Sequence, residues 1–420
     1  MFIHINNCLK KRGVGRFCGL LVFLLLGMTM DGCRKEVQPE RLTNYTGKSY
    51  SEVFEAYWNG MNTNYVFWDI DTVVWNSKYK TYKPLFESLD GQQRDSTTEA
   101  KAVQYIVDMS IDLADSHMNL TFNDTVIYVV GGHEFRSRSF SPSKVRYLLR
   151  GGHPAIPRKV FDTIIYNNYL TNAEHGIGQL TIEGETGTVR VNVGIIPQNN
   201  KKILYLEYPV FLLKMLYDDP STSNSVKIVF DHFFGYTKDP TIDGLIIDLR
   251  SNSGGMNADL DFLLGRLITD PVHFYYTRYK NGAGRLDYTP WIKGYVHPQS
   301  GGTNFTKPIA VLVDNYSLSM AELTSMAAKA IFPKAKLVGE RTWGGNGTIE
   351  PDDDVQFLGG VFTAANFVSV FMATFESRDK NLISYENIGL PPDIPIAYDS
   401  TAIKNNIDVQ LDKAIEYITQ

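Results

Sequence analysis

Two serines stand at the start of a predicted helix, where a hydroxyl group could act as a nucleophile. Ser317 and Ser319 lie in the stretch NYSLSMAE (residues 315–322), directly after the apolar run PIAVLVD. Such a run followed by a helical pattern predicts a buried strand that leads into a helix. The amino-terminal end of a helix favours a developing alkoxide, although a serine there is more often only a helix cap. A nucleophilic serine would also need a base elsewhere in the chain.

Two further stretches carry residue types that could complete such chemistry. His117 follows Ser116 in LADSHMNLTF, at the end of a predicted helix, and Glu386 precedes a turn in YENIGLPPDI. A lone histidine is usually an ordinary surface or core residue. The other histidines lie far apart without metal-ligand spacing such as H-E-x-x-H, so we expect no metal and no cofactor.

A glycine-rich turn is the remaining candidate element. In GLIIDLRSNSGGMNADLDFLLGRLI (residues 244–268) a buried strand ends in a polar loop and a helix follows at once. The backbone amides of Gly254 and Gly255 would then be exposed at the positive end of a helix, where amides can stabilise an oxyanion. The simpler alternative is a tight turn that needs glycine for its dihedral angles.

The elements that must position these residues indicate an α/β protein. Apolar strands (KILYLEY, GLIIDLR, IAVLVD, AKLVGE) alternate with helical segments from about residue 201 to 420, which is typical of a layered α/β domain. Amphipathic helices predict a helical region over 51–125, and QLTIEGETGTVRVNV predicts a hairpin in a β-rich middle region over 126–200. A degenerate PDZ domain is one interpretation of that middle region.

Four motifs together make the pattern specific. GLIIDLRSNSGG, YSLSMAE, LVGERTWGG and ENIGLPPDIPI occur in this order, and the chain resembles the C-terminal processing peptidase superfamily of serine peptidases over about 51–125 and 200–420. This resemblance implies a protease core with the crotonase-like (ClpP/crotonase-type) fold. It also implies that Ser319, three residues before Glu322 in the Ser-x-x-Glu motif, is the nucleophile and that Ser317 is structural.

Superfamily members use one of two catalytic arrangements. One branch uses a Ser/Lys dyad with the lysine in GE-x-T-F-G-K-G, but this chain reads GERTWGGNG and has Gly345 at that place. The tricorn-like branch uses serine, histidine and glutamate with a second serine beside the histidine. Its residue types stand at the matching positions: Ser319, His117, Glu386 and Ser116.

The resemblance to the tricorn-like branch assigns a role to each residue. His117 would take the proton from Ser319 and return it to the leaving amine, while Glu386 holds the imidazole, either directly or through Ser116. The amide of Met320 and that of Gly254 or Gly255 would bind the oxyanion. We expect no strong pKa shift at His117, because imidazole already titrates near neutral pH.

Two departures limit what the resemblance implies about substrates. Met320 stands where the tricorn-like branch has an acidic residue that helps to select basic side chains. The carboxylate-binding loop of a PDZ domain is not recognisable in residues 126–200, so selection of protein tails is not predicted. The expected substrates are peptides or unfolded proteins, which the enzyme would hydrolyse through an acyl-enzyme.

The first residues have the order of an export signal. Basic residues from Lys10 to Arg16 precede the apolar run 17–30, which is too short to span a bilayer. We expect a signal peptide over 1–32, a lipid anchor on Cys33 and a tether over 33–50, hence a periplasmic or outer-membrane lipoprotein of a Gram-negative bacterium. A secretory signal without lipidation is the alternative. The other cysteines are Cys8 and Cys18, so the mature chain could form no internal disulfide.

Charge argues against one class of partner, and two other functions stay open. Removal of residues 1–32 takes four of the 41 basic and one of the 46 acidic residues, which leaves a net charge of −8 and does not favour nucleic acid. One alternative is a non-catalytic protein with a crotonase-like fold that binds an apolar ligand or a peptide. Another is a Ser/Lys peptidase that uses a different lysine: Lys329, Lys334 or Lys336.

Overall fold

A computed structural model of the 420-residue chain describes residues 43–152, 154–155, 158–182, 185–220, 225–349 and 359–420. The predicted signal peptide 1–32, Cys33 and the tether up to residue 42 lie outside the described residues. The rest of the predicted tether is part of the fold, because strand β1 (Asn44–Tyr45) pairs with β12 (Val361–Ala364). No helix in the described ranges is long and apolar enough to cross a membrane.

Three helices follow β1, as the amphipathic periodicity predicts: α2 (Tyr50–Asn64), α3 (Trp75–Asp90) and α4 (Ser96–Ser110). Ser49 and Glu52 form a capping box at the start of α2, which satisfies amides that have no partner within the helix. The aromatic residues of this region pack on each other, with the rings of Trp58 and Trp75 stacked at 4.9 Å. They form a buried core between the helices and the adjoining sheet.

That adjoining sheet has five strands in the order β1-β12-β13-β2-β3. Its remaining strands are β2 (Asn119–Val130), β3 (His133–Phe140) and β13 (Val368–Phe371). The hairpin β12–β13 comes from the part of the chain that the sequence predicted to belong to the core over 201–420. The buried side chain of Phe362 explains its position, because it packs against Gly60 of α2 within the core of the helical region.

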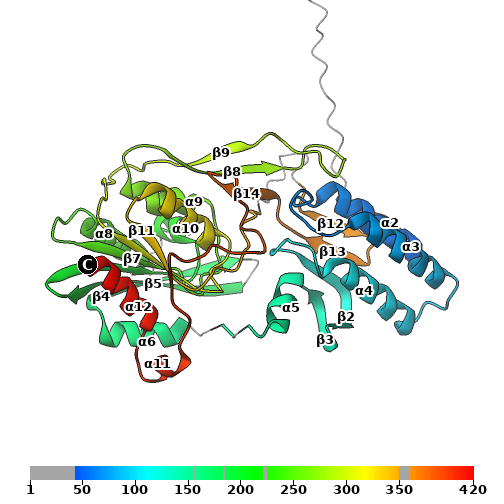
Figure 1. Cartoon of the computed structure of the whole chain (residues 1–420), viewed down its shortest axis with the longest axis horizontal. Coiled ribbons are helices and arrows are strands. Elements are labelled where there is room, and N and C mark those ends of the chain that lie inside the picture. Colours follow the sequence, from blue (N-terminus) through cyan, green and yellow to red (C-terminus); the bar gives the residue numbers. More distant parts are fainter. Residues whose placement is uncertain (1–42, 153, 156–157, 183–184, 221–224, 350–358) are drawn as a thin grey trace, which may run out of the picture. The chain divides into compact units, whose positions relative to one another are not determined.

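The larger sheet has seven strands in the order β15-β11-β10-β7-β6-β5-β4 (Figure 1). Strands β6, β7, β10, β11 and β15 are parallel, and β4 and β5 add an antiparallel edge. Their bounds are β4 (Thr171–Ile182), β5 (Glu185–Gln198), β6 (Lys201–Glu207), β7 (Gly244–Asp248), β10 (Ile309–Val313), β11 (Ala335–Gly339) and β15 (Ile394–Pro395). The predicted middle region 126–200 is therefore divided, since β2 and β3 belong to the five-stranded sheet and the β4–β5 hairpin extends this one.

Helices cover both faces of the seven-stranded sheet, which explains why its central strands are apolar along their whole length. One face packs on α7 (Leu213–Asp218), α8 (Val226–Tyr236), α9 (Ala258–Leu263) with its 3₁₀ extension (Leu264–Leu267), and α10 (Met320–Ile331). The other face packs on α6 (Arg158–Asn168) and α12 (Val409–Thr419).

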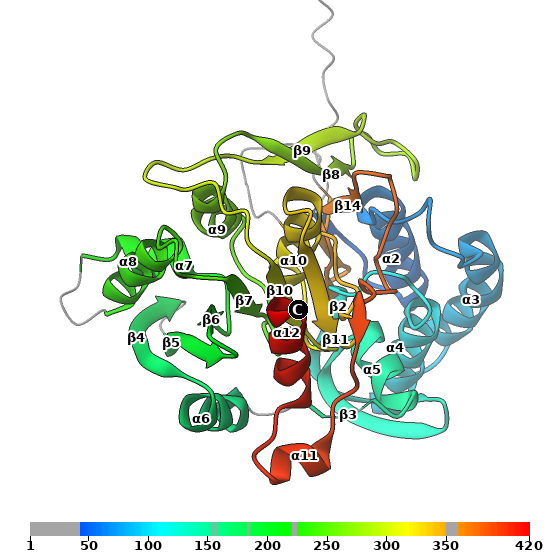
Figure 2. The ribbon, with the colours of Figure 1, turned by 60° about the vertical axis from the view of Figure 1, so that its left-hand side comes forward.

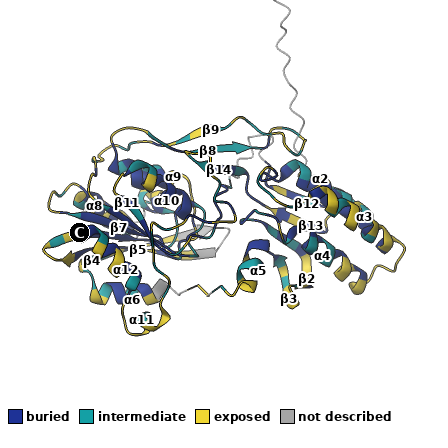
Figure 3. Cartoon of the chain, viewed as in Figure 1, coloured by how far each residue is buried: buried dark blue, intermediate teal, exposed yellow. Residues whose placement is uncertain are grey.

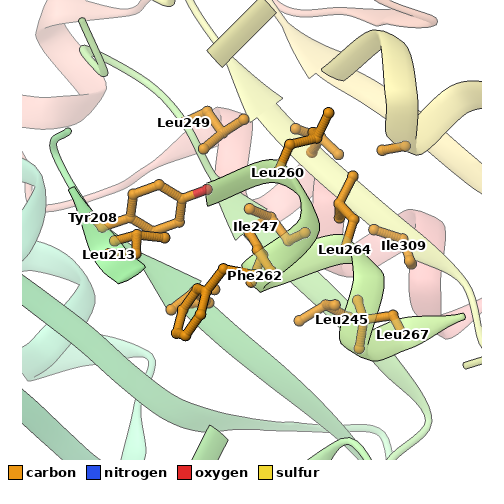
Figure 4. Close-up of a cluster of buried hydrophobic side chains, with 14 of the residues drawn as sticks. Tyr208, Leu213, Leu245, Ile247, Leu249, Leu260, Phe262, Leu264, Leu267 and Ile309 are labelled. Atoms are coloured by element: carbon orange, nitrogen blue, oxygen red, sulfur yellow. The ribbon is translucent and has the colours of Figure 1, made fainter. Parts of the chain in front are cut away.

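The side chains of β7 show how the two faces alternate. Leu245 and Ile247 pack with Leu260 and Leu264 from the α9 segment (Figure 4), whereas Ile246 points to the α6 and α12 side. Figure 2 shows the same layers from another side, and Figure 3 shows β7 buried along its length. The result is a mixed α/β protein in which the carboxyl ends of β7 and β10 lie beside each other.

The remaining elements connect these parts. A three-stranded sheet has the order β14-β8-β9, with β8 (Val272–Tyr279), β9 (Ile292–Val296) and β14 (Phe375–Asp379). Two short helices complete the described chain, α5 (Pro142–Leu149) and α11 (Ser400–Lys404). Helix α5 lies beside β3 in Figures 1 and 2.

Candidate active site

Ser319 stands on a sharp turn between β10 and α10. Its backbone has φ 59° and ψ −117°, a conformation that glycine usually supplies at the first central position of a type II′ turn. Holding a residue with a side chain in so sparsely populated a region requires about 1–3 kcal/mol from the surrounding structure. The hydroxyl is presented at the amino end of α10 by a half-buried residue, as in the strained strand-to-helix turns that expose nucleophilic serines.

Ser317 differs from Ser319 in every respect that matters for reactivity. It is fully buried, its hydroxyl donates to the carbonyl of Leu249 at 2.7 Å, and it accepts the amide of Asp314 at 3.0 Å. These bonds join β7 to the turn after β10. Ser317 therefore has a visible structural role, which matches what the family resemblance implies.

Glu322 connects the Ser319 turn to the segment 342–346. Its buried carboxylate accepts the amides of Ser319 at 3.2 Å, Gly345 at 2.7 Å and Gly344 at 2.8 Å, and the hydroxyl of Thr342 at 2.5 Å. Burial raises the pKa of Glu322 to about 7, although these hydrogen bonds act in the opposite direction. One side chain thus fixes the backbone on both sides of the candidate nucleophile.

His117 lies between the end of α4 and the start of β2, with its ring nitrogens buried. Neither nitrogen has a hydrogen-bond partner among the described residues. Burial lowers the pKa of His117 to about 4, whereas the sequence predicted no strong shift, because burial could not be seen in the sequence. The ring is therefore neutral at neutral pH and free to accept a proton.

Glu386 and Asp115 lie beside His117. One ring nitrogen of His117 and one carboxylate oxygen each of Asp115 and Glu386 lie within 4.8 Å of one another. Glu386 accepts the backbone amides of Ser116 and Gly347, each at 2.8 Å. It is the amide of Ser116, and not its hydroxyl, that contacts Glu386. Burial and the neighbouring charge of Asp115 raise the pKa of Glu386 well above its ordinary value.

Asp115 is a residue of this site that the motifs did not identify. Its carboxylate accepts the amides of His117 at 2.7 Å and Ala373 at 2.8 Å, so it sets the backbone from which the imidazole projects. Burial raises the pKa of Asp115 to about 6. The signal in the sequence is an aspartate two residues before the histidine, the spacing at which an Asp side chain binds a backbone amide of its own turn.

The glycine loop lies directly against the serine turn. Gly254 has φ +90°, and a Cβ atom there would lie 2.6 Å from the Cβ of Ser319 and 2.9 Å from the amide nitrogen of Met320. The amide of Gly254 donates to Asn252 Oδ1 at 2.9 Å. The amides of Gly255 and Met320 make no such contact within the described part of the chain, so they are the better candidates for binding an oxyanion.

The structure brings the predicted residues to one place through the segment 344–347, without a direct bond between Ser319 and His117. Gly345 shares Glu322 with Ser319, and a Cβ at Gly345 would lie 3.1 Å from Cε1 of His117. Gly347 then contacts Glu386. The backbone at Ser319 and the backbone at Ser116, next to His117, are thus connected through adjacent residues of one short segment.

A lysine base has less support. Lys329 lies in the last turn of α10, ten residues after Ser319, which is about 15 Å along a helix axis. It forms an ion pair with Asp393 at 2.9 Å. Lys334 is exposed and Lys336 lies on β11.

Comparison with known proteins finds a family match over part of the chain. Residues 202–396 match the model of peptidase family S41. The tricorn protease of Thermoplasma volcanium is 27% identical over 183 residues, which are 44% of this chain and 15% of that protein. That of Thermoplasma acidophilum is 27% identical over 185 residues, again 15% of its length. The chain therefore spans only a small part of the curated relatives that it matches.

Solved structures share the fold. A candidate peptidase from Parabacteroides merdae ATCC 43184 has a TM-score of 0.62 and 21% identity, with 89% of this chain and 98% of that one covered. Mature CPAF in complex with lactacystin has a TM-score of 0.52 and 13% identity, with 88% and 97% covered. These structures show a shared fold, and the match of residues 202–396 to peptidase family S41 supports the prediction that the chain is a serine peptidase.

Proposed function

We propose that this protein is a serine endopeptidase in which Ser319, His117 and Glu386 form the catalytic triad. The observation that carries the proposal is a strained serine at the start of α10 together with a buried imidazole that has no partner among the described residues, on two segments that residues 344–347 connect through Glu322 and Glu386. A polar ring left without a hydrogen bond in the interior costs about 1–3 kcal/mol. A reacting hydroxyl would supply the missing partner.

In the proposed reaction, His117 removes the proton of Ser319 as the hydroxyl oxygen attacks the peptide carbonyl. The oxyanion is stabilised by the amides of Met320 and Gly255, and the imidazolium then donates the proton to the leaving amine. The positive ring forms beside the carboxyl groups of Glu386 and Asp115. A positive charge so close favours the ionised forms of these carboxyl groups, and their negative charge in turn stabilises the imidazolium. Water hydrolyses the acyl-enzyme with His117 again acting as the base. In this proposal the hydrogen bond between hydroxyl and ring forms when substrate binds, since catalytic hydrogen bonds often tighten only in the complex.

The remaining parts of the proposal concern the fold, the substrate and the location. We assign the seven-stranded sheet and its helices to the crotonase-like fold, and peptides or unfolded proteins as substrates. We also propose that residues 1–32 are an export signal and that Cys33 carries a lipid. The protein would then be a periplasmic or outer-membrane lipoprotein. Metabolic labelling with a radioactive fatty acid tests the anchor, because Cys33→Ser should abolish incorporation.

A fluorophosphonate probe tests the triad, since it labels only an activated serine. The wild type should be labelled on Ser319, and both Ser319→Ala and His117→Ala should lose the label. His133→Ala changes an exposed histidine and should keep it. Because the CPAF neighbour was solved with lactacystin, that compound should compete with the probe. Labelling that persists in His117→Ala would contradict the assigned base, and a chain that is never labelled would favour a non-catalytic binding protein.

A further inference from the structure

A small cavity adjoins the candidate active site and has walls of one charge. Ser116 and Asn387, the chain neighbours of His117 and Glu386, line it together with Arg146, Tyr147, Arg150 and Trp343. Its volume of about 70 Å³ exceeds the roughly 10–15 Å³ that one water molecule needs. The cavity is therefore large enough for a small side-chain group beside the proposed triad.

The two arginines form no ion pair with a carboxylate of the described residues, although the charges of Asp112 and Asp71 act on Arg146 from a greater distance. Arg146 donates to the carbonyls of Ile111 and Leu113, the latter at 2.9 Å, and to Asn387 Oδ1 at 2.8 Å. These acceptors are all neutral. Arg150 ends α5 and is exposed. Among the described residues, no Asp or Glu oxygen lies within 4.0 Å of either guanidinium, and none of the residues lining the cavity is acidic.

The surroundings destabilise the cationic form of Arg146. Its pKa is lowered by burial, and the charge of Arg150 acts in the same direction, whereas the charges of Asp112 and Asp71 offset part of this effect. Arg146 and Arg150 also line a second, neighbouring cavity, in which Asp112 is the acidic lining residue. A carboxylate oxygen of Asp112 lies 3.9 Å from Nζ of Lys78. Two guanidiniums side by side, one of them largely removed from water, form a place that an incoming anion would stabilise.

We propose that the Arg146–Arg150 cavity is a subsite that binds a carboxylate of the substrate, from an acidic side chain or from a free chain end. This inference rests on the proposed function, because it assumes a peptide in the adjoining site. The guanidiniums would bind the carboxylate oxygens. The rings of Tyr147 and Trp343, whose centroids lie 5.1 Å apart, would contact the methylene groups of a glutamate. The acidic residue that would favour basic side chains is replaced by Met320, so nothing there opposes this preference.

Matched peptides test the subsite. In a series of internally quenched peptides, one Glu is moved along the sequence, each peptide has a Gln twin of the same shape, and each is made with a free or an amidated carboxyl end. We expect kcat/KM to be at least about ten-fold higher for the Glu peptide than for its Gln twin at one position, or for the free carboxyl end than for the amidated end. A ten-fold difference corresponds to about 1.4 kcal/mol. The series also shows which source of the carboxylate the cavity takes.

Variants of one helix connect that preference to the cavity. Arg150→Gln should reduce the preference to about three-fold or less, and Arg150→Glu should reverse it. Lys144→Gln removes an equal charge from an exposed position of α5 outside the cavity and should leave the preference unchanged. Arg150 is the better choice for substitution, because loss of Arg146 would also disturb the backbone after α4.

Binding to the inactive variant separates this inference from the proposed function. The dissociation constants of the same peptides for Ser319→Ala are measured by fluorescence anisotropy. Suppose that the wild type hydrolyses all peptides, and that kcat/KM differs less than two-fold between Glu and Gln twins and between free and amidated ends. The proposed subsite would then be refuted, and the proposed peptidase activity would be supported. Suppose instead that no peptide is hydrolysed, but that Ser319→Ala binds the peptides with a carboxylate more tightly than their neutral twins and that Arg150→Gln removes this difference. The proposed subsite would then be supported, and the proposed peptidase activity would be refuted. Absence of both effects overturns both.

Discussion

Replacement of Ser319 by glycine should inactivate the protein and yet make it more stable than replacement by alanine. The backbone of Ser319 at φ 59° and ψ −117° brings any Cβ atom into a strained position, and such strain amounts to about 1–3 kcal/mol. Alanine keeps the Cβ atom and the strain, whereas glycine adopts this conformation freely. Both substitutions remove the hydroxyl, so the comparison isolates the backbone.

The magnitude follows from two opposing effects. Relief of strain favours the glycine variant by about 1–3 kcal/mol, and the greater freedom of glycine in the unfolded chain opposes it by about 0.4–1 kcal/mol. The free energy of unfolding of Ser319→Gly should therefore exceed that of Ser319→Ala by about 0.5–2 kcal/mol. Urea unfolding of the two variants, followed by fluorescence, measures this difference directly.

Ser317 provides the matched control. It lies two residues earlier, is buried, and its φ is not positive, so glycine there should be less stable than alanine by about 0.5–1 kcal/mol. If Ser319→Gly proves less stable than Ser319→Ala by a similar amount, the turn stores no strain. The argument that the fold holds Ser319 in a special conformation for catalysis would then be refuted.

Three further outcomes are expected. Gly345→Ala should reduce fluorophosphonate labelling at least about ten-fold, because its Cβ would lie 2.3 Å from Leu318 Cδ1 and 3.1 Å from His117 Cε1; Gly91→Ala, with no atom within 4 Å, should label normally, and equal labelling of the two would count against the placement of His117. Glu322→Gln should destabilise the protein by about 1–3 kcal/mol, because an amide has one accepting oxygen for the donors that the carboxylate now serves. Since burial raises the pKa of Glu322 from 4.5 to about 7, the folded state binds this proton more tightly and the free energy of unfolding falls as pH rises between these values; urea titrations at pH 4.5 and 7 should show that this dependence is smaller in the variant. The pH profile of kcat/KM should have an acid limb closer to pH 4 than to 6.5, because burial lowers the pKa of His117 and the ring can accept a proton throughout that range; a limb at 6.5 would mean that the free enzyme holds the ring in water.

The sequence predicted the elements whose pattern is local. The apolar strands now seen as β6, β7, β10 and β11 and the helices between them follow from runs and periodicities of a few residues. It did not predict that β12 and β13 leave the core to complete the other sheet, or that β4 and β5 extend the larger one. Those pairings join residues far apart in the chain, and no local pattern carries their partners.

The same distinction applies to the candidate site. The sequence indicates Ser319, His117 and Glu386 because their residue types match a mechanism and their motifs resemble a family. Asp115 and Glu322 act on backbone amides, and an amide is present at almost every position of any sequence. A carboxylate whose partners are amides therefore gives at most a local sign of its role, such as the spacing of Asp115 and His117, and its distant contacts to Ala373 or Gly345 appear only in the folded chain.

The segment 344–347 gives a physical reason why position 345 carries no side chain in this chain. The Ser/Lys arrangement would place a lysine at Gly345, but a Cβ atom there would meet Leu318 at 2.3 Å and the His117 ring at 3.1 Å. A lysine at this position would therefore require both Leu318 and the His117 ring to move. Without a side chain, Gly345 keeps its amide on Glu322 and leaves the space beside the His117 ring open. The absence of a side chain at residue 345 is thus part of what allows His117 to be the base in the proposed mechanism.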